Sequence, residues 1–127
     1  MFTKISNAFR LVFGELFAAL SRIDIDMESD ECLVIDVNTR KIFVDKTKRS
    51  VSSSDRLIAK FETIQSIDVE HFVNGKRFEW WVVSLQLVGG RKIRICKSVD
   101  GVQLAIVAAH LGTVTGNSVR AFSRVGW

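Results

Sequence analysis

The feature that most constrains the fold of this chain is a change in the spacing of its apolar residues near residue 22. Over residues 2–21, large apolar side chains recur every three or four positions and therefore share one face of a helix. Beyond that point Ile23, Ile25 and Met27 alternate with acidic residues, a period of two that places them on one face of a strand. The sequence thus predicts an amphipathic N-terminal helix followed by a sheet.

Six further strands are predicted downstream, separated by short turns rich in polar residues and glycine. They cover residues 31–37, 40–45, 57–61, 65–73, 77–88 and 91–97. Asn74 and Gly75 suit a type I′ hairpin turn, whose two central residues both need positive φ, and Gly89 and Gly90 predict a second tight turn. Residues 46–56 are predicted as a basic, serine-rich loop. We therefore expect an antiparallel meander of seven strands.

The alternation within these strands also predicts a core. The residues expected in or around it are Val34, Ile42, Trp81, Val83, Ile93 and Ile95. Trp81 alternates with Val83 and Leu85 on the core face, whereas Trp80 falls on the opposite face. Base stacking by Trp80 would require an exposed ring, and the sequence leaves its exposure open.

A second helix is predicted over residues 99–115, with Ser98 as its N-cap, Asp100 at the positive end of its dipole and Gly116 at its end. Its apolar residues form two faces. One face holds mainly small residues (Val102, Ala105, Ala109 and Gly112) and the other holds larger ones (Leu104, Val107, Leu111 and Val114). A helix that is apolar on two sides needs two partners. We expect the sheet on one side and the N-terminal helix, of the same or a neighbouring chain, on the other.

The composition sets the broad class of the protein. The chain has 127 residues with no proline, and its 47% hydrophobic and 25% charged residues exclude disorder over most of the length. A domain of this size folds without disulfides or structural metal. The net charge of +4 is a mild bias towards anionic partners. Cys32 and Cys96 lie in predicted strands as small hydrophobes, which favours a reducing, cytoplasmic location.

Four segments of the chain resemble bacterial pleckstrin-homology-like (PH-like) domains, in the same order and at similar spacing. They read CLVIDVNTRKIFV, FETIQSIDVE, WWVVSLQLVGGRKIRI and AIVAAHLGTVTGNSV. The resemblance implies an α+β fold, a seven-stranded antiparallel barrel or two-sheet sandwich capped by a C-terminal helix, in a binding or scaffold module without enzymatic activity. It covers about residues 22–119. Residues 1–21 then form an additional helix and residues 120–127 a C-terminal tail.

No catalytic, cofactor-binding or metal-ligating group is predicted from the sequence. His71 and His110 lie on different predicted elements, away from any serine, cysteine or acid in a known motif. The alternating carboxylates of Asp24, Asp26 and Glu28 are typical of a solvated strand face and not of a cation site. We therefore expect no enzymatic activity, no cofactor and no small-molecule substrate.

Two kinds of interaction surface follow from the residue pattern. A protein-partner or homo-oligomer interface is predicted on the helices, with Phe2, Phe9, Phe13, Phe17, Leu20, Ala105 and Ala109 as candidates. The alternative is a peripheral binder of anionic membrane or nucleic acid. Its candidate residues are Lys46, Lys48, Arg49 and Arg56 in the basic loop, with a second patch of Arg91, Lys92, Arg94 and Lys97.

The charges on the N-terminal helix favour the protein interface over the membrane. A helix that lies on a membrane surface is usually rich in basic residues beside its apolar face, whereas this one offers only Lys4 and Arg10 against Glu15. We expect a cytoplasmic protein, with a location peripheral to the membrane as the alternative.

Overall fold

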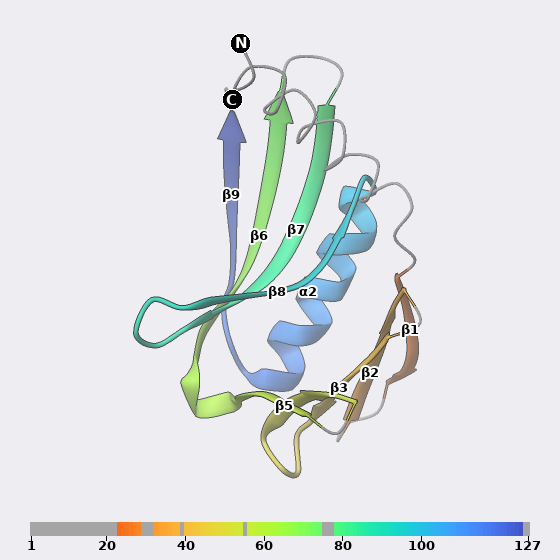
Figure 1. Cartoon of the computed structure of the whole chain (residues 1–127), viewed down its shortest axis with the longest axis vertical. Coiled ribbons are helices and arrows are strands. Elements are labelled where there is room, and N and C mark those ends of the chain that lie inside the picture. The colour runs from red at the N-terminus through yellow and green to blue at the C-terminus, as the bar shows by residue number, and fades with distance from the viewer. Residues whose placement is uncertain (1–22, 29–31, 39, 55, 75–77, 126–127) are drawn as a thin grey trace, which may run out of the picture.

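The computed structural model describes residues 23–28, 32–38, 40–54, 56–74 and 78–125, and every structural statement below concerns these residues. They form an α+β fold of two sheets and one α-helix near the C-terminus (Figure 1). The helix predicted over residues 2–21 and the turn at Gly75 lie outside the described ranges.

The first sheet is an antiparallel meander of five strands in chain order. The strands are β1 (Ile23–Glu28), β2 (Cys32–Val37), β3 (Arg40–Asp45), β4 (Ser50–Ser53) and β5 (Arg56–Lys60). In β2 the buried side chains of Leu33, Ile35 and Val37 share one face, as the period of two predicts.

The second sheet has the strand order β8-β7-β6-β9. Its elements are β6 (Ile64–Asn74), β7 (Phe78–Leu87), β8 (Lys92–Ser98) and β9 (Val119–Val125), and a short 3-10 helix, η1 (Phe61–Thr63), leads into it from β5. β9 runs parallel to β6, while the other pairs are antiparallel. A parallel strand requires a crossover connection, and the helix α2 (Gly101–Thr115) supplies it between β8 and β9.

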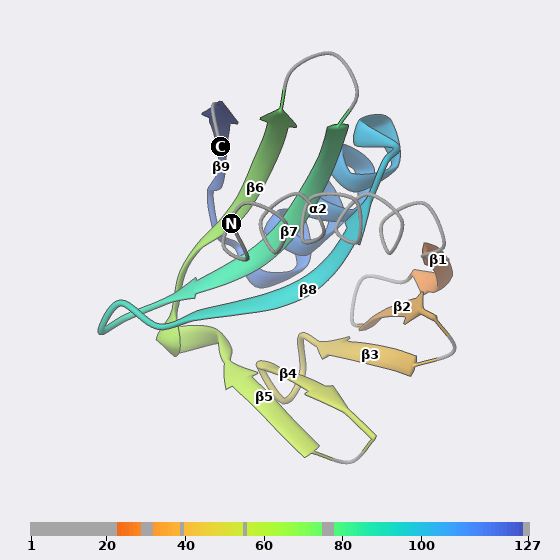
Figure 2. The same ribbon diagram turned by 45° about the horizontal axis from the view of Figure 1, so that its top comes forward.

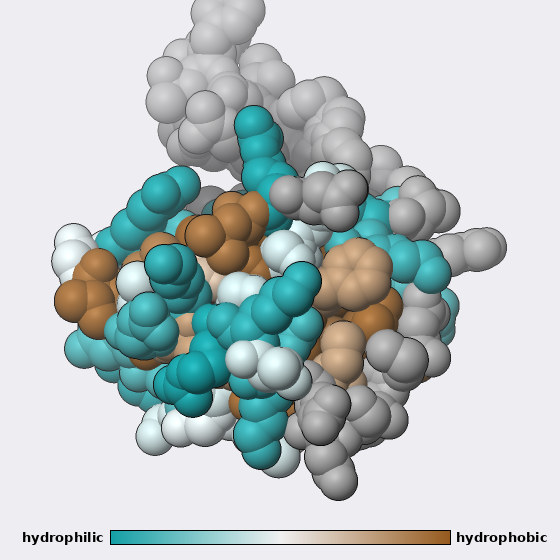
Figure 3. Space-filling model, turned by 90° about the horizontal axis from the view of Figure 1, so that it is seen from below, coloured by the Kyte–Doolittle hydropathy of each residue, from teal (hydrophilic) through white to brown (hydrophobic). Residues whose placement is uncertain are grey.

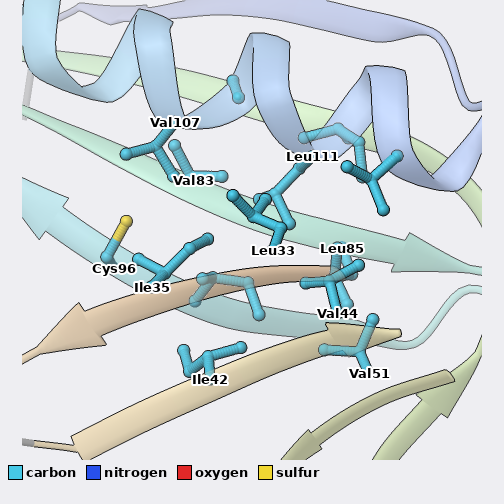
Figure 4. Packing of buried hydrophobic residues seen from close by; sticks show 14 of the residues in the cluster. Leu33, Ile35, Ile42, Val44, Val51, Val83, Leu85, Cys96, Val107 and Leu111 are labelled. Atoms are coloured by element: carbon cyan, nitrogen blue, oxygen red, sulfur yellow. The ribbon is translucent and has the colours of Figure 1, made fainter. Parts of the chain in front are cut away.

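The main core lies between α2 and the two sheets. Leu33 and Ile35 of β2 meet Val83 of β7 and Val107 and Leu111 of α2, and all five are almost completely buried (Figure 4). Burial of each such side chain stabilises the fold by about 1.5–3 kcal/mol relative to exposure in water. The larger apolar face of α2 therefore packs onto the sheets, as predicted.

The ends of α2 are set by Asp100 and Gly116. The Asp100 carboxylate accepts the backbone N–H groups of Val102 and Gln103, while the Ser98 hydroxyl accepts the N–H of Asp100. The helix therefore begins two residues later than predicted, and the N-cap is Asp100 instead of Ser98. Gly116 has a φ of 73° in the left-handed region and ends the helix, as predicted.

The predicted antiparallel meander of seven strands is wrong, since the described residues form nine strands in two separate hydrogen-bonded sheets and β9 pairs in parallel with β6. The predicted loop over residues 46–56 contains the strand β4, in which Val51 is fully buried. β4 is only four residues long, and Val51 is its one apolar residue, so it has little alternation to detect. β9 lies largely within residues 120–127, for which the sequence predicts only a C-terminal tail.

The face of the second sheet opposite α2 carries a smaller hydrophobic cluster of Trp80 and Val82, with Phe72 packed against it. Trp80 is only 6% exposed, and its ring stacks on Phe72 with the centroids 5.4 Å apart. Its burial answers the question left open by the sequence, because a buried indole is not a platform for bases. The tight turn at Gly89 and Gly90 is confirmed, with φ values of 96° and 92°.

Most of the predicted core residues lie in the main core. Ile42, Val83 and Ile95 belong to it, and Trp81 and Ile93 pack against it while partly exposed. Val34 is buried as well but outside this cluster. The reason is its place in β2, where it alternates with Leu33 and Ile35 and so points to the other face of the strand.

Candidate functional site

The side of α2 that faces away from the sheets is apolar and accessible. Val102 and Ile106 are 72% and 49% exposed, and the exposed Ala105 and Ala109 lie beside them. These four residues follow the spacing i, i+3, i+4, i+7 and therefore form one stripe, here called the α2 stripe. α2 contains no aspartate, glutamate, lysine or arginine, so an uncharged helix face meets the solvent.

A shallow groove runs along the α2 stripe, and Trp81 and Gly101 line it too. The indole of Trp81 packs so closely beneath the helix that a Cβ atom on Gly101 would lie 2.6 Å from its Cε2 atom. On its other side Trp81 stacks on His71, with ring centroids 4.3 Å apart, and His71 Nε2 lies 2.7 Å from Glu79 Oε1. These contacts hold the indole between Gly101 and His71 at this end of the groove.

Of the predicted interface residues, Ala105 and Ala109 lie on the α2 stripe. Gly112, grouped with them on the predicted small-residue face, is buried instead, where an added Cβ would lie 2.9 Å from Val119 Cγ2. Ile106 was missed, although its position four residues after Val102 is a signal that could have identified it. The remaining interface candidates lie outside the described residues, and they are Phe2, Phe9, Phe13, Phe17 and Leu20.

The structure does not bring the four predicted anion-binding residues together. Lys46, Lys48 and Arg49 lie in the exposed turn between β3 and β4, where the Asp45 carboxylate accepts two backbone N–H groups. Arg56 lies at the opposite end of the β4–β5 hairpin, about 10 Å away at 3.4 Å per strand residue.

Figure 3, which views the molecule from the lower end of Figure 1, shows hydrophilic side chains gathered in the centre with hydrophobic patches around them.

The predicted basic patch in residues 91–97 is also divided. Lys92 Nζ lies 2.9 Å from Glu70 Oε1 and 3.4 Å from Asp68 Oδ2, so two carboxylates compensate its charge. Arg91 is exposed in the hairpin that follows β7, whereas Arg94 and Lys97 line a separate cavity.

Lys92 belongs to a charge network on the sheet face opposite α2, here called the outer charge network. Its members are Asp68 and Glu70 on β6, Lys92 on β8, and Arg120 and Arg124 on β9. Arg120 Nε donates to Asp68 Oδ1 at 3.1 Å and its Nη2 to Oδ2 at 3.2 Å, a bidentate pair, and Arg124 Nε donates to Glu70 Oε2 at 3.2 Å. The network therefore ties the parallel strand β9 to β6.

The network lowers the pKa values of its two acids. Burial raises the pKa of the Asp68 carboxyl, but hydrogen bonds from Arg120 and Ser66, with the neighbouring positive charge, outweigh burial and hold the pKa below its ordinary value. Burial acts on the pKa of Glu70 in the same way, and Lys92 and Arg124 outweigh it. Both acids are therefore ionised at neutral pH and act as structural anions.

His71 and Cys96 differ in their exposure to solvent. His71 and Glu79 lie partly exposed at the surface, where the histidine stacks on Trp81. Burial raises the pKa of the Cys96 thiol to about 12 despite the nearby charge of Arg40, so it is protonated at neutral pH and a poor nucleophile. Within the described ranges, no group of three or more histidine, cysteine, aspartate or glutamate residues is placed to hold a metal ion.

Two further findings concern the chain as a whole. In the part of the chain that the structure describes, no helix combines the length and apolar character needed to cross a membrane. Comparison of the sequence and structure with models of known protein families, with curated proteins and with solved structures gave no match.

Proposed function

We propose that this protein is a non-enzymatic PH-like interaction module that self-associates through the α2 stripe. The observation that carries the proposal is the accessible, uncharged helix face of Val102, Ala105, Ile106 and Ala109. Scattered apolar residues are normal on a protein surface, but a contiguous apolar stripe beside a groove is typical of an interface.

A second copy of the chain is the occupant that best fits this stripe. A face without charge offers no electrostatic complement to a charged partner, whereas it matches an identical face across a two-fold axis. The stripe also alternates in size, since Val102 and Ile106 project while Gly101, Ala105 and Ala109 leave room beside them. Two antiparallel copies of α2 can therefore interdigitate, with large residues of one copy opposite small residues of the other.

The size of the stripe indicates a weak dimer. α2 has 15 residues and is therefore about 22 Å long. Burying Val102 and Ile106 is worth at most about 1.5–3 kcal/mol each, and the loss of translational and rotational freedom offsets part of that gain. Small interfaces of this kind support micromolar association. We therefore expect a concentration-dependent dimer rather than an obligate one.

The proposed PH-like character is supported by the element order, in which eight antiparallel strands in two sheets precede a helix that packs across the core. The main departures are the additional short strand β4 and the parallel strand β9. A cytoplasmic location agrees with the free cysteines Cys32 and Cys96.

Sedimentation equilibrium of the full chain tests the proposal. The wild type should shift from monomer towards dimer as its concentration rises through the micromolar range. Ile106→Lys should stay monomeric, because the dimer would then bury two unpaired ammonium groups close to the two-fold axis. The matched control is Leu57→Lys, which places the same charge at an equally accessible apolar residue of β5.

The controls decide between the possible interfaces. A wild type that remains monomeric at high micromolar concentration contradicts self-association. An Ile106→Lys chain that still dimerises removes the α2 stripe from the interface. A full-length variant with Phe9 and Phe13 changed to serine tests the N-terminal segment in the same way, and loss of the dimer in this variant would assign that segment to the interface as well.

The alternative, a peripheral binder of anionic membrane or nucleic acid, loses support from the structure. Arg56 lies apart from Lys46, Lys48 and Arg49, and Lys92 is paired with acids. Lys46, Lys48 and Arg49 nevertheless lie close together in the exposed turn between β3 and β4. If the wild type co-sediments with anionic vesicles and the double variant Lys46→Gln/Lys48→Gln does not, membrane binding through this turn is favoured again.

A further inference from the structure

We propose that the cavity between β8 and the β2–β3 turn binds a small molecule that combines an apolar body with an anionic group. The cavity has a volume of about 400 Å³, within the range of small-molecule sites. It lies apart from the α2 stripe, and the inference does not depend on self-association.

Both sheets contribute to the lining of this cavity. Val37, Asn38 and Arg40 come from the β2–β3 turn of the first sheet, and Val82 comes from β7. β8 supplies four consecutive residues, Arg94, Ile95, Cys96 and Lys97. Figure 2 shows β8 at the edge of the second sheet. The cavity thus lies where the two sheets approach each other without sharing hydrogen bonds.

An irregularity in β8 explains why successive residues line one cavity. In a regular strand, neighbouring side chains point to opposite faces. Here Cys96 pairs with Val83 and Arg94 with Ser84, which leaves Ile95 as an extra residue without a partner in the ladder. This pattern is a β-bulge, and the side chains of Ile95 and Cys96 are consequently both buried. Bulges of this kind commonly redirect side chains at binding sites.

The turn on the other side of the cavity positions a third cation. Asn38 has a φ of 52°, in the left-handed region that asparagine tolerates, and Val37 pairs directly with Arg40 across the turn. Arg40 thereby starts β3 beside the cavity, on the opposite side from Arg94 and Lys97. The two sheets therefore hold positive charges around one space.

The charges of the lining select for an anion. Arg40, Arg94 and Lys97 are cationic, and none of the described lining residues is acidic. Neither Arg40 nor Arg94 has a salt bridge to an acidic side chain within the described ranges. Burial lowers the pKa of the Lys97 ammonium, and the charge of Arg94 lowers it further. An anion between Arg40 and Arg94 would compensate the charges of both guanidinium groups.

The rest of the lining selects for an apolar body. Val37, Val82, Ile95 and Cys96 are all buried and provide the apolar walls. A simple inorganic anion would leave these walls without contacts, whereas a ligand with an aromatic or aliphatic body would cover them while its anionic group meets the guanidinium groups.

Titration of the full-length, ¹⁵N-labelled protein with phenyl phosphate, followed by NMR, tests the inference. Saturable shifts should map to the backbone amides of Asn38, Arg40 and residues 94–97. Inorganic phosphate, which lacks the apolar body, should bind at least about tenfold more weakly. Benzylamine, which carries a positive charge on a similar body, should not shift these amides at all.

Variants assign the binding to this cavity. Arg40→Gln and Arg94→Gln should each weaken phenyl phosphate binding by about tenfold, as expected for loss of one charge-assisted contact. The control is Arg91→Gln, an exposed arginine outside the cavity on the hairpin next to β8. Arg94→Lys, which keeps the charge, should retain part of the affinity, and the dispersion of each spectrum reports folding.

A vesicle experiment distinguishes a lipid headgroup from a soluble molecule as the ligand of this cavity. Phosphatidylcholine vesicles containing phosphatidic acid present the same phosphate chemistry on a lipid. Co-sedimentation that is lost in Arg94→Gln assigns the site to a lipid headgroup, and binding of phenyl phosphate without co-sedimentation assigns it to a soluble ligand. The inference is overturned if phenyl phosphate causes no saturable shift, if its shifts map elsewhere, or if both glutamine variants bind as tightly as the wild type.

Discussion

Asp68 is a deeply buried acid, with 1% of its surface exposed, and its two carboxylate oxygens both accept hydrogen bonds. Ser66 and Arg120 donate to them, and Lys92 lies within ion-pair distance. A carboxylate in this environment contributes to stability only while it is ionised and its donors remain in place.

The substitution Asp68→Asn should therefore lower the free energy of unfolding by about 1–3 kcal/mol at neutral pH, because one oxygen is replaced by an N–H₂ group that faces Arg120. Urea denaturation measures the change. Glu62→Gln, at an exposed acid of η1, is the control and should change stability by less than about 0.5 kcal/mol.

The sign of the pH dependence follows from the lowered pKa values of Asp68 and Glu70. Acids whose pKa is lower in the folded than in the unfolded state stabilise the protein fully above their unfolded values of about 4, and this contribution is lost as the pH falls through the folded values. The difference in unfolding free energy between wild type and Asp68→Asn should shrink as the pH drops below about 4. A difference that is the same at pH 7 and in strong acid would contradict the ion-pair account.

At the scale of elements, α2 depends on its first turn. Asp100→Ala removes the acceptor for two backbone N–H groups and should lower the free energy of unfolding by about 1 kcal/mol. Asp100→Asn keeps a side-chain oxygen and should retain most of the stability. If the two variants are equally destabilised in urea, charge at the helix end matters more than the capping hydrogen bond.

The elements that sequence reasoning identified are those with strong local signals. β2, β7 and β8 alternate or carry long apolar runs, and α2 has a large apolar face bounded by a capping acid and by Gly116. β9 pairs with β6, whose residues precede it by about 50 positions, so its parallel register has no local signature. Its two arginines are explained only by the buried acids Asp68 and Glu70.

The two candidate sites also differ in how far a local sequence pattern predicts them. Helical spacing placed Ala105 and Ala109 on a second apolar face of α2, for which the sequence predicted the N-terminal helix as the partner, and the structure adds Ile106 and the groove beside Trp81. Two cations of the cavity, Arg94 and Lys97, belong to the basic patch predicted in residues 91–97, but the cavity itself was not predicted. Its lining depends on a bulge at Ile95 and on the approach of Arg40 from another sheet, and neither is visible in a local pattern.

At the scale of the whole molecule, the second sheet separates different roles. One face packs on α2 and the main core, and the opposite face carries Trp80, Val82 and the outer charge network. The α2 stripe faces outward from the core side, whereas the cavity lies at the β8 edge. Self-association through the stripe would leave the cavity accessible in each copy, so a dimer would present two anion sites.

The central claim, that two copies meet through the α2 stripe, is tested most directly by crosslinking at the stripe itself. Ala105→Cys in a Cys32→Ser background, treated with a short bismaleimide, should give a covalent dimer because the two-fold axis brings both thiols together. Leu57→Cys in the same background, at another exposed residue on β5, should remain monomeric under the same conditions. We expect efficient crosslinking of Ala105→Cys alone. Equal crosslinking of the two variants, or none at residue 105 at concentrations where the protein sediments as a dimer, would contradict it.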